Sequence, residues 1–380
     1  MREEDLWAVW ARASPGWGFL PASDGHRYRV LYPGRLSRSL GPDFQDTVLL
    51  RDDGRLLKGD VEVHRALHGW EAHGHAGDPR YRGVLLHVVL RGALHFSPLP
   101  PHIDLSVALH FQGDGTAFPY VGAIPSKGCL HRWADARFRQ RASAYARLIA
   151  SLGADEALYR GLMEGMGYGA NREPMRLLAE AVPYRVLRRV ALPCPPDQRP
   201  LLLGAVLLGS GGLLLPESDL APLWTATGLG AILGRGAWTW AGVRPANRPE
   251  RRLWGMALLL DRWWEGGLLA GICGTVGQGP RRLEAALMVS SPLGGPALIG
   301  HQRARELVVS IVLPFLWAWA VYTGDAPLRR AVWGVWKTFP PPEENTVSRA
   351  MRALLPSPLP NTARLQQGLL AWSHRLGLAC

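Results

Sequence analysis

Two hydrophobic patterns divide the chain near residue 130. Before that point, short runs rich in β-branched residues alternate with turn residues, which is typical of strands. Asp52-Asp53-Gly54 separates two of these runs and predicts a hairpin. Another run, residues 84–90, is apolar almost throughout, which predicts a central strand buried on both faces. The predicted strands cover residues 28–32, 47–51, 56–64, 84–90 and 105–111.

Beyond residue 130, apolar positions recur at helical spacing. Two apolar runs, residues 201–215 and 307–322, fall under the roughly 18 residues of a spanning helix, so we expect buried helices and no membrane association, with a membrane span as the minor alternative. The predicted helices cover residues 137–152, 155–166, 174–181, 251–264, 303–322, 327–337, 346–355 and 362–376. We therefore predict an α/β domain over residues 1–130 and a mostly helical domain over residues 131–380, an α+β chain overall.

Charge and cysteine content narrow the function classes. The formal net charge is +12, from 43 Lys and Arg against 31 Asp and Glu, which favours an anionic partner such as nucleic acid. An arginine-rich genome explains the same charge equally well. The four cysteines are scattered without a CxxC pair, which indicates reduced thiols. The acidic N-terminus does not resemble a signal peptide, so we expect a cytoplasmic protein.

Acids and histidines are concentrated between residues 41 and 87. Alternation along the strand at 56–64 places Asp60, Glu62 and His64 on one face. Asp43 enters the antiparallel neighbour, so Asp43 and Glu62 can converge on one Mg²⁺ or Mn²⁺ ion, with the backbone carbonyl of Val63 as a third ligand. Asp60 is either a further ligand or a supporting group. His64 can orient or deprotonate the attacking water.

Two further groups of residues can assist this site. His73 and His75 are two apart, which places both on one side of an extended segment for phosphate contact, and His87 reads best as a hydrogen-bonded core histidine. With His64 and Asp78, the pair could instead form a zinc site. A second group is the basic stretch at residues 244–252, which contains Arg244, Asn247, Arg251 and Arg252. Such a stretch can bind phosphates, or it can simply be the start of a helix with solvated charges.

The motif Pro42-Asp43 followed by Glu62-Val63-His64 resembles the PD-(D/E)xK nuclease superfamily. The resemblance implies a restriction-endonuclease-like mixed sheet flanked by helices, and metal-dependent cleavage of DNA or RNA. His64 stands where the superfamily usually has lysine, so water activation would fall to an imidazole. Trp70 with His73-Gly74-His75 is similar to the very-short-patch mismatch-repair endonucleases, although the tryptophan is displaced by two residues.

Most of the chain resembles the bacterial family called domain of unknown function 2851. Members often end in several closely spaced cysteines, of which this chain has only Cys380. The pattern appears in Gly41-Pro42-Asp43-Phe44, Gly59-Asp60-Val61-Glu62-Val63-His64, His73-Gly74-His75, Leu86-His87-Val88-Val89, Gly167-Tyr168, Val243-Arg244-Pro245-Ala246-Asn247, Pro342 to Asn345, and Gln366-Gln367.

Three hypotheses follow. The first is a Mg²⁺- or Mn²⁺-dependent nuclease in which Asp43 and Glu62 hold the metal, His64 acts on water, and His73 and His75 assist. The second is a non-catalytic module that keeps a nuclease fold and binds nucleic acid or protein, which the missing lysine favours; its binding would depend on salt and not on metal. The third is a zinc hydrolase centred on the histidines and Asp78.

Overall fold

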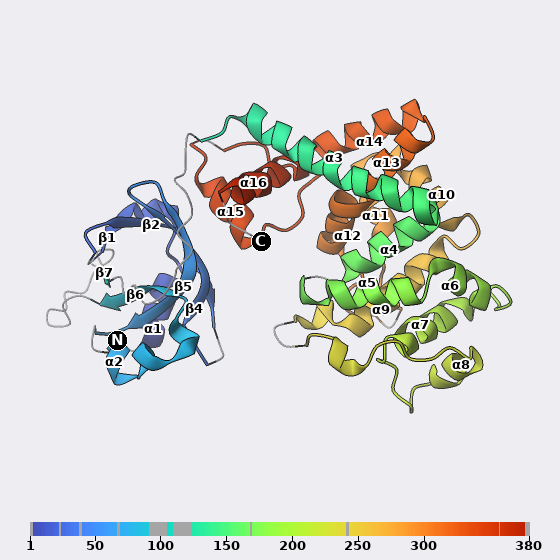
Figure 1. Ribbon diagram of the computed structural model, residues 1–380, viewed down its shortest axis with the longest axis horizontal. Helices are drawn as coiled ribbons and strands as arrows, with labels where there is room; N and C mark the ends of the chain where they lie inside the picture. Colours follow the sequence, from blue (N-terminus) through green and yellow to red (C-terminus); the bar gives the residue numbers. More distant parts are fainter. Residues whose placement is uncertain are drawn as a thin grey trace. The chain divides into compact units, whose positions relative to one another are not determined.

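The computed structural model describes residues 3–22, 24–37, 40–66, 69–90, 105–108, 124–167, 169–240, 243–292, 294–356 and 358–376 (Figure 1). It divides into two compact units. We name the first the sheet unit, made of Met1–Ala134, Glu344–Pro360 and Leu365–Cys380. The second, made of Asp135–Glu343 and Asn361–Arg364, we name the helical unit.

The sheet unit contains a mixed sheet in the order β1-β2-β4-β5-β6-β7, with β3 paired to β4. Only β5 and β6 run parallel; the other pairs are antiparallel. Because β1 and β7 also approach each other, the sheet is curled. The strands are β1 (Phe19–Pro21), β2 (Arg27–Tyr32), β3 (Arg35–Leu36), β4 (Phe44–Arg51), β5 (Leu56–His64), β6 (Val84–Leu90) and β7 (Leu105–Ala108). All five predicted strands are confirmed; residues 109–111 lie outside the described residues.

Helices cover both faces of this sheet, because successive side chains along a strand point to opposite faces and both faces carry apolar residues. Helix α1 (Glu3–Trp10) packs Leu6 and Trp10 against Val61 and Val63 of β5. On the other face, Leu56 packs against α15 (Thr346–Ala353), α16 (Ala363–Arg375) and the beginning of α3 (Lys127–Leu152). Each fully buried aliphatic side chain contributes roughly 1.5–3 kcal/mol.

A long crossover joins β5 to β6, because parallel neighbours cannot be joined by a tight turn. It contains α2 (Gly69–Ala72) and two 3₁₀ turns, η2 (His75–Gly77) and η3 (Pro79–Tyr81). Gly74 has φ of 71°, a conformation that glycine adopts without strain. The extended segment predicted for His73 and His75 is wrong: the chain turns between them, and His73 is exposed while His75 is buried.

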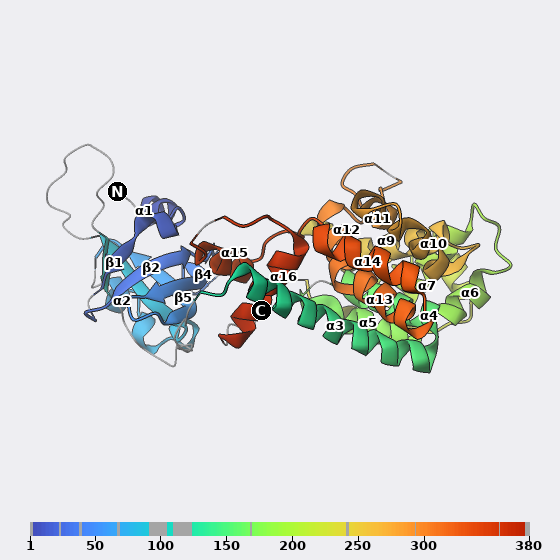
Figure 2. The ribbon, with the colours of Figure 1, turned by 90° about the horizontal axis from the view of Figure 1, so that it is seen from above.

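The helical unit contains the rest of α3 and eleven further α-helices among its described residues (Figure 2). The helical pattern predicted beyond residue 130 is confirmed. The bounds are α4 (Ala154–Met166), α5 (Arg172–Ala181), α6 (Tyr184–Ala191), α7 (Arg199–Ser210), α8 (Ala221–Ala226), α9 (Pro249–Arg262), α10 (Gly267–Val276), α11 (Pro280–Leu287), α12 (His301–Leu307), α13 (Leu313–Tyr322) and α14 (Ala326–Thr338).

Among the residues that the structure describes, one helical segment is long and apolar enough to cross a membrane by length and composition. It runs over His301–Tyr322, from α12 through a π-helical turn, η7 (Val308–Val312), into α13. Its most apolar window has a mean hydropathy of 1.6, and 67% of that window is buried inside the protein, as in a core helix. The π turn ends two residues before Pro314, whose ring and missing N–H disturb the regular helix there.

The two units are not separated by a single cut in the sequence. The first division lies at Ala134, close to the predicted boundary at residue 130, but α15 and most of α16 belong to the sheet unit. The reason is the apolar cluster in which Met351 and Leu369 cover Leu31 and Val48 of the sheet. Helical periodicity identifies both helices but does not say which core they enter.

Candidate metal centre

Asp43 and Glu62 are linked to each other across the β4–β5 hairpin. The backbone N–H of Asp43 donates to Glu62 Oε2 at 2.9 Å, and the backbone N–H of Val63 donates to Asp43 Oδ2 at 3.0 Å. The hairpin register pairs Phe44 with Val61, which brings the two acids side by side. The structure thus places together the two carboxylates that the sequence predicted to converge.

Three histidines extend this acid pair into a cluster. His64 ends β5, and its Nε2 lies 3.1 Å from Nδ1 of His73 and 3.7 Å from Oε1 of Glu62. Nε2 of His75 lies 3.2 Å from the same Glu62 oxygen. One ligand atom from each histidine can be chosen so that all three lie within 4.8 Å of one another. We name Asp43, Glu62, His64, His73 and His75 the acid–histidine cluster.

Neighbouring side chains fix the orientation of the buried rings. His87 of β6, fully buried, places its Nε2 2.7 Å from Nδ1 of His64. Tyr81 stacks on His75 with ring centroids 3.9 Å apart, and Trp70 meets the same ring edge-on at 5.4 Å. Gly69 lies so close to His64 that a Cβ there would be 2.8 Å from its Cγ. The imidazoles are therefore held before any ligand arrives.

Burial shifts the protonation of the cluster towards neutral forms. Burial, together with the charge of Asp43, raises the pKa of Glu62 to about 8. It also raises the pKa of Asp43 to about 6, against the opposing effect of the Val63 N–H. Burial and the neighbouring histidines lower the pKa of His64 to about 3 and the pKa of His75 below its usual value. A bound cation would stabilise both ionised carboxylates and would take neutral imidazoles as ligands.

Asp60 belongs to a different group of charges, although it lies on the Glu62 side of β5. Its Oδ1 accepts from the backbone N–H of Asp46, a residue held at φ of 61° by a bulge in β4. Asp46 in turn pairs with Arg35 at 3.0 Å and Lys58 at 3.2 Å. The predicted role of Asp60 as a metal ligand thus has no support from its contacts, which tie it to this ionic group.

The predicted nucleic-acid contacts differ in exposure. Arg244 is exposed, whereas Arg252 is 5% exposed. Arg252 donates from Nη1 to the Leu298 carbonyl at 2.6 Å and from Nη2 to Oδ1 of Asn247. Arg251 donates to the Pro296 carbonyl at 2.7 Å. Arg252 and Asn247 therefore serve the packing of the helical unit, and phosphate contact in this stretch stays a prediction.

Asp78, which the zinc hypothesis placed among the ligands, is engaged elsewhere. Its carboxylate accepts from the backbone N–H of Arg80 at 2.9 Å and from the Arg80 guanidinium. That pairing lowers the pKa of Asp78 to about 2. Glu62, not Asp78, is the carboxylate that meets the histidines.

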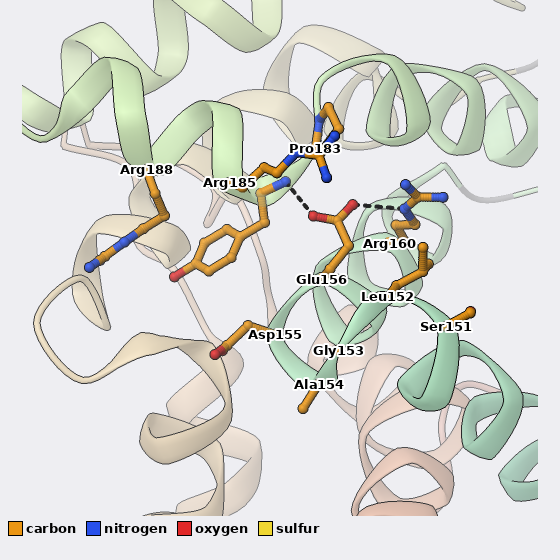
Figure 3. A pocket seen from close by; sticks show the side chains of 11 residues that line it. Ser151, Leu152, Gly153, Ala154, Asp155, Glu156, Arg160, Pro183, Arg185 and Arg188 are labelled. Carbon is orange, nitrogen blue, oxygen red and sulfur yellow. Dashed lines mark hydrogen bonds and ion pairs between the residues drawn. The ribbon is translucent and has the colours of Figure 1, made fainter.

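A pocket of about 550 Å³ lies in the helical unit (Figure 3). Its acids already have partners: Glu156 accepts from Nε of Arg160 and from the backbone N–H of Tyr184, each at 2.8 Å. Asp155 accepts from the backbone N–H of Leu269 at 2.9 Å. These bonds join α4 to α6 and α10, so the acids stabilise the packing there and leave the acid–histidine cluster as the candidate site.

His87 lies closer to the candidate site than its place in an apolar strand predicts. A lone histidine in an apolar strand is usually a satisfied core residue. The signal was the parallel register, which pairs His87 with Glu62 and so places it beside the site. That register follows from the crossover, which the strand pattern alone does not reveal.

The comparisons with known proteins give a family but no activity. A family model described as protein of unknown function (DUF2851) matches residues 3–94 and 116–269, which is more than half of the chain. No curated protein and no solved structure matches the chain.

Proposed function

This chain belongs to the DUF2851 family, and we propose that it is a metal-dependent phosphodiesterase that hydrolyses nucleic acid at the acid–histidine cluster. The observation that carries the proposal is the interlocked pair of the half-buried Asp43 and the buried Glu62, whose pKa values burial raises to about 6 and about 8. Such a pair is costly to ionise without a cation and is suited to binding one.

The topology around the pair supports a relation to the PD-(D/E)xK nucleases. Asp43 and Glu62 stand on adjacent antiparallel strands, a parallel strand β6 follows, and helix α1 packs on the sheet. We propose on this basis a restriction-endonuclease-like sheet unit. His64 occupies the usual lysine position, but its pKa of about 3 keeps it neutral. It would bind metal or orient a water and would not act as a fixed cation.

The reaction is phosphodiester hydrolysis. Asp43 and Glu62 would hold a divalent ion, which would neutralise charge at the phosphate and lower the pKa of a water. The water oxygen forms a bond to phosphorus and loses a proton to solvent, the bond to the leaving oxygen breaks, and that oxygen takes up a proton from solvent. The products are a phosphomonoester and a free hydroxyl. Asp43 is half-buried and His73 exposed, so these two side chains stand where a phosphate and its water would approach.

The test is cleavage of labelled DNA and RNA, single- and double-stranded, by the full-length protein with Mg²⁺, Mn²⁺ or Zn²⁺ added. Asp43→Asn and Glu62→Gln keep shape and remove charge, and we expect each to lower the cleavage rate at least 100-fold. Asp60→Asn is the matched control, since it lies on the same side of β5 outside the cluster. Cleavage that persists unchanged in both cluster variants would refute the proposal.

The zinc hydrolase remains a second candidate, because three imidazoles lie close together and two of them contact Glu62. In this hypothesis the zinc ligands come from the same cluster, without Asp78. The bond hydrolysed would not be a phosphodiester if nucleic acid is not cleaved. The non-catalytic module has no specific contact in its favour; metal-independent, salt-dependent nucleic-acid binding would be its signature.

A further inference from the structure

We propose that the cluster binds one transition-metal ion of the zinc class, with His64, His73, His75 and Glu62 as ligands, and that His87 positions His64 for this role. The inference concerns the site of the proposed function and can be tested without a substrate. It differs from the Mg²⁺ or Mn²⁺ expected from the sequence, and it assigns Asp43 a place beside the ligands.

The separations between the ligand atoms fit a tetrahedral ion. Zinc binds four ligands at about 2.0–2.2 Å, which places neighbouring ligand atoms roughly 3.4 Å apart. In the cluster, His64 Nε2 lies 3.1 Å from His73 Nδ1. Glu62 Oε1 lies 3.2 Å from His75 Nε2 and 3.7 Å from His64 Nε2. Three edges of a tetrahedron are thus nearly formed by side chains whose other contacts hold them.

The donor set selects the class of metal. Imidazole nitrogens suit zinc, copper, iron and nickel, whereas Mg²⁺ prefers carboxylate and water oxygens in an octahedron. Three of the four proposed ligands are imidazoles from the β5 end and the crossover. A site of this composition would bind Zn²⁺ far more tightly than Mg²⁺.

His87 determines which nitrogen of His64 faces the ion. It is 0% exposed and meets Nδ1 of His64 at 2.7 Å. When Nδ1 of His64 donates its proton to His87 Nε2, the lone pair of His64 Nε2 points at Glu62 and His73. Metal-binding histidines generally have their second nitrogen held in this way. His87 is therefore a positioning residue that does not itself touch the ion.

The cluster is also open on one side. His64, His75 and Glu62 are 1%, 8% and 5% exposed, whereas His73 is exposed. The buried ligands fix the ion, and the exposed one leaves it within reach of solvent. Substituting His73 removes a ligand without disturbing the core, which makes it the cleanest variant.

The experiment is a Zn²⁺ titration of metal-stripped full-length protein in competition with a chromophoric chelator, repeated with Mg²⁺ in excess. Co²⁺ is used in parallel, because its visible absorption reports tetrahedral coordination. We expect one ion per chain and no displacement by Mg²⁺. Loss of affinity should be about 100-fold or more in His73→Ala and roughly 10–100-fold in His87→Leu, with partial recovery in His87→Gln, whose amide oxygen can accept from His64.

His26→Ala is the matched control, because His26 lies in the sheet unit and bonds to Asp52 outside the cluster. Circular dichroism verifies the fold of each variant. Unchanged Zn²⁺ affinity in folded His73→Ala, or displacement of Zn²⁺ by Mg²⁺, would overturn the inference. Tight Zn²⁺ binding without nucleic-acid cleavage would refute the proposed function alone. Cleavage with Mg²⁺ and no Zn²⁺ site would refute this inference alone.

Discussion

Gly69→Ala should damage the site without removing any proposed ligand. The added Cβ would lie 2.8 Å from Cγ, 2.9 Å from Cδ2 and 3.0 Å from Cβ of His64, where ordinary contact needs 3.4 Å or more. The ring is 1% exposed, and its two nitrogens are held by His87 and His73, so it has no free direction of retreat. One of these contacts must lengthen by a few tenths of an ångström or more.

The magnitude has two parts. Overpacking a filled site costs about 1–3 kcal/mol. Displacing a metal ligand or its support lowers metal affinity by roughly 10–100-fold. Without the clash, Gly69→Ala would stabilise the folded protein, because alanine in a helix is favoured over glycine by about 0.5–1 kcal/mol. Gly69 begins α2 and does not have a left-handed backbone conformation. A loss of stability in Gly69→Ala would therefore report the clash directly.

The assay is Zn²⁺ affinity by chelator competition, together with thermal unfolding of the metal-free protein. Gly77→Ala is the matched control: it lies in the same crossover, and its added Cβ meets nothing within 4 Å. We expect Gly69→Ala to lose both affinity and stability while Gly77→Ala keeps both. If the two variants behave alike, His64 is not held as described and the reasoning fails.

Three further outcomes are expected. The metal-free protein should lose stability between about pH 6.5 and 8, by at most ~1.4 kcal/mol per pH unit. The reason is that Glu62, with its pKa of about 8, still binds a proton in the folded state, whereas the unfolded state has released it. A pH series of thermal melts should show that this slope vanishes in Glu62→Gln. Arg252→Ala should lower the free energy of unfolding by about 1–3 kcal/mol in a denaturant titration, because it leaves the Leu298 carbonyl unpaired. An unchanged denaturation midpoint would return Arg252 to the candidates for phosphate contact. Leu369→Ala should cost about 2–5 kcal/mol in the same assay, since α16 belongs to the sheet core, and a negligible loss would contradict that packing.

Local pattern predicts that the two acids meet, but not their exact pairing. The Asp52-Asp53-Gly54 turn fixes the hairpin and pairs β4 with β5, while a one-residue shift between Phe44 and Thr47, which the pattern does not show, brings Asp43 beside Glu62. Alternation along β5 then places His64 on the Glu62 side. The hairpin and the alternation depend on residues close together in sequence, which is why they could be predicted.

The histidines required information that the sequence pattern does not carry. Gly74 turns the crossover so that His75 reaches Glu62 while His73 stays exposed. The parallel pairing of β6 places His87 behind His64, and the bulge at Asp46 commits Asp60 to another group. Each depends on a turn or a long-range pairing, as does the packing of α15 and α16 on the sheet.

The central claim is that the acid–histidine cluster holds a metal ion, and metal content tests it most directly. Protein purified without chelators would be measured by elemental mass spectrometry, beside a His73→Ala/His75→Ala variant whose fold is verified by circular dichroism. The account predicts one zinc-class ion per chain in the natural protein and little in the variant. Equal metal in both proteins, or none in the natural protein even after Zn²⁺ is supplied, would contradict it.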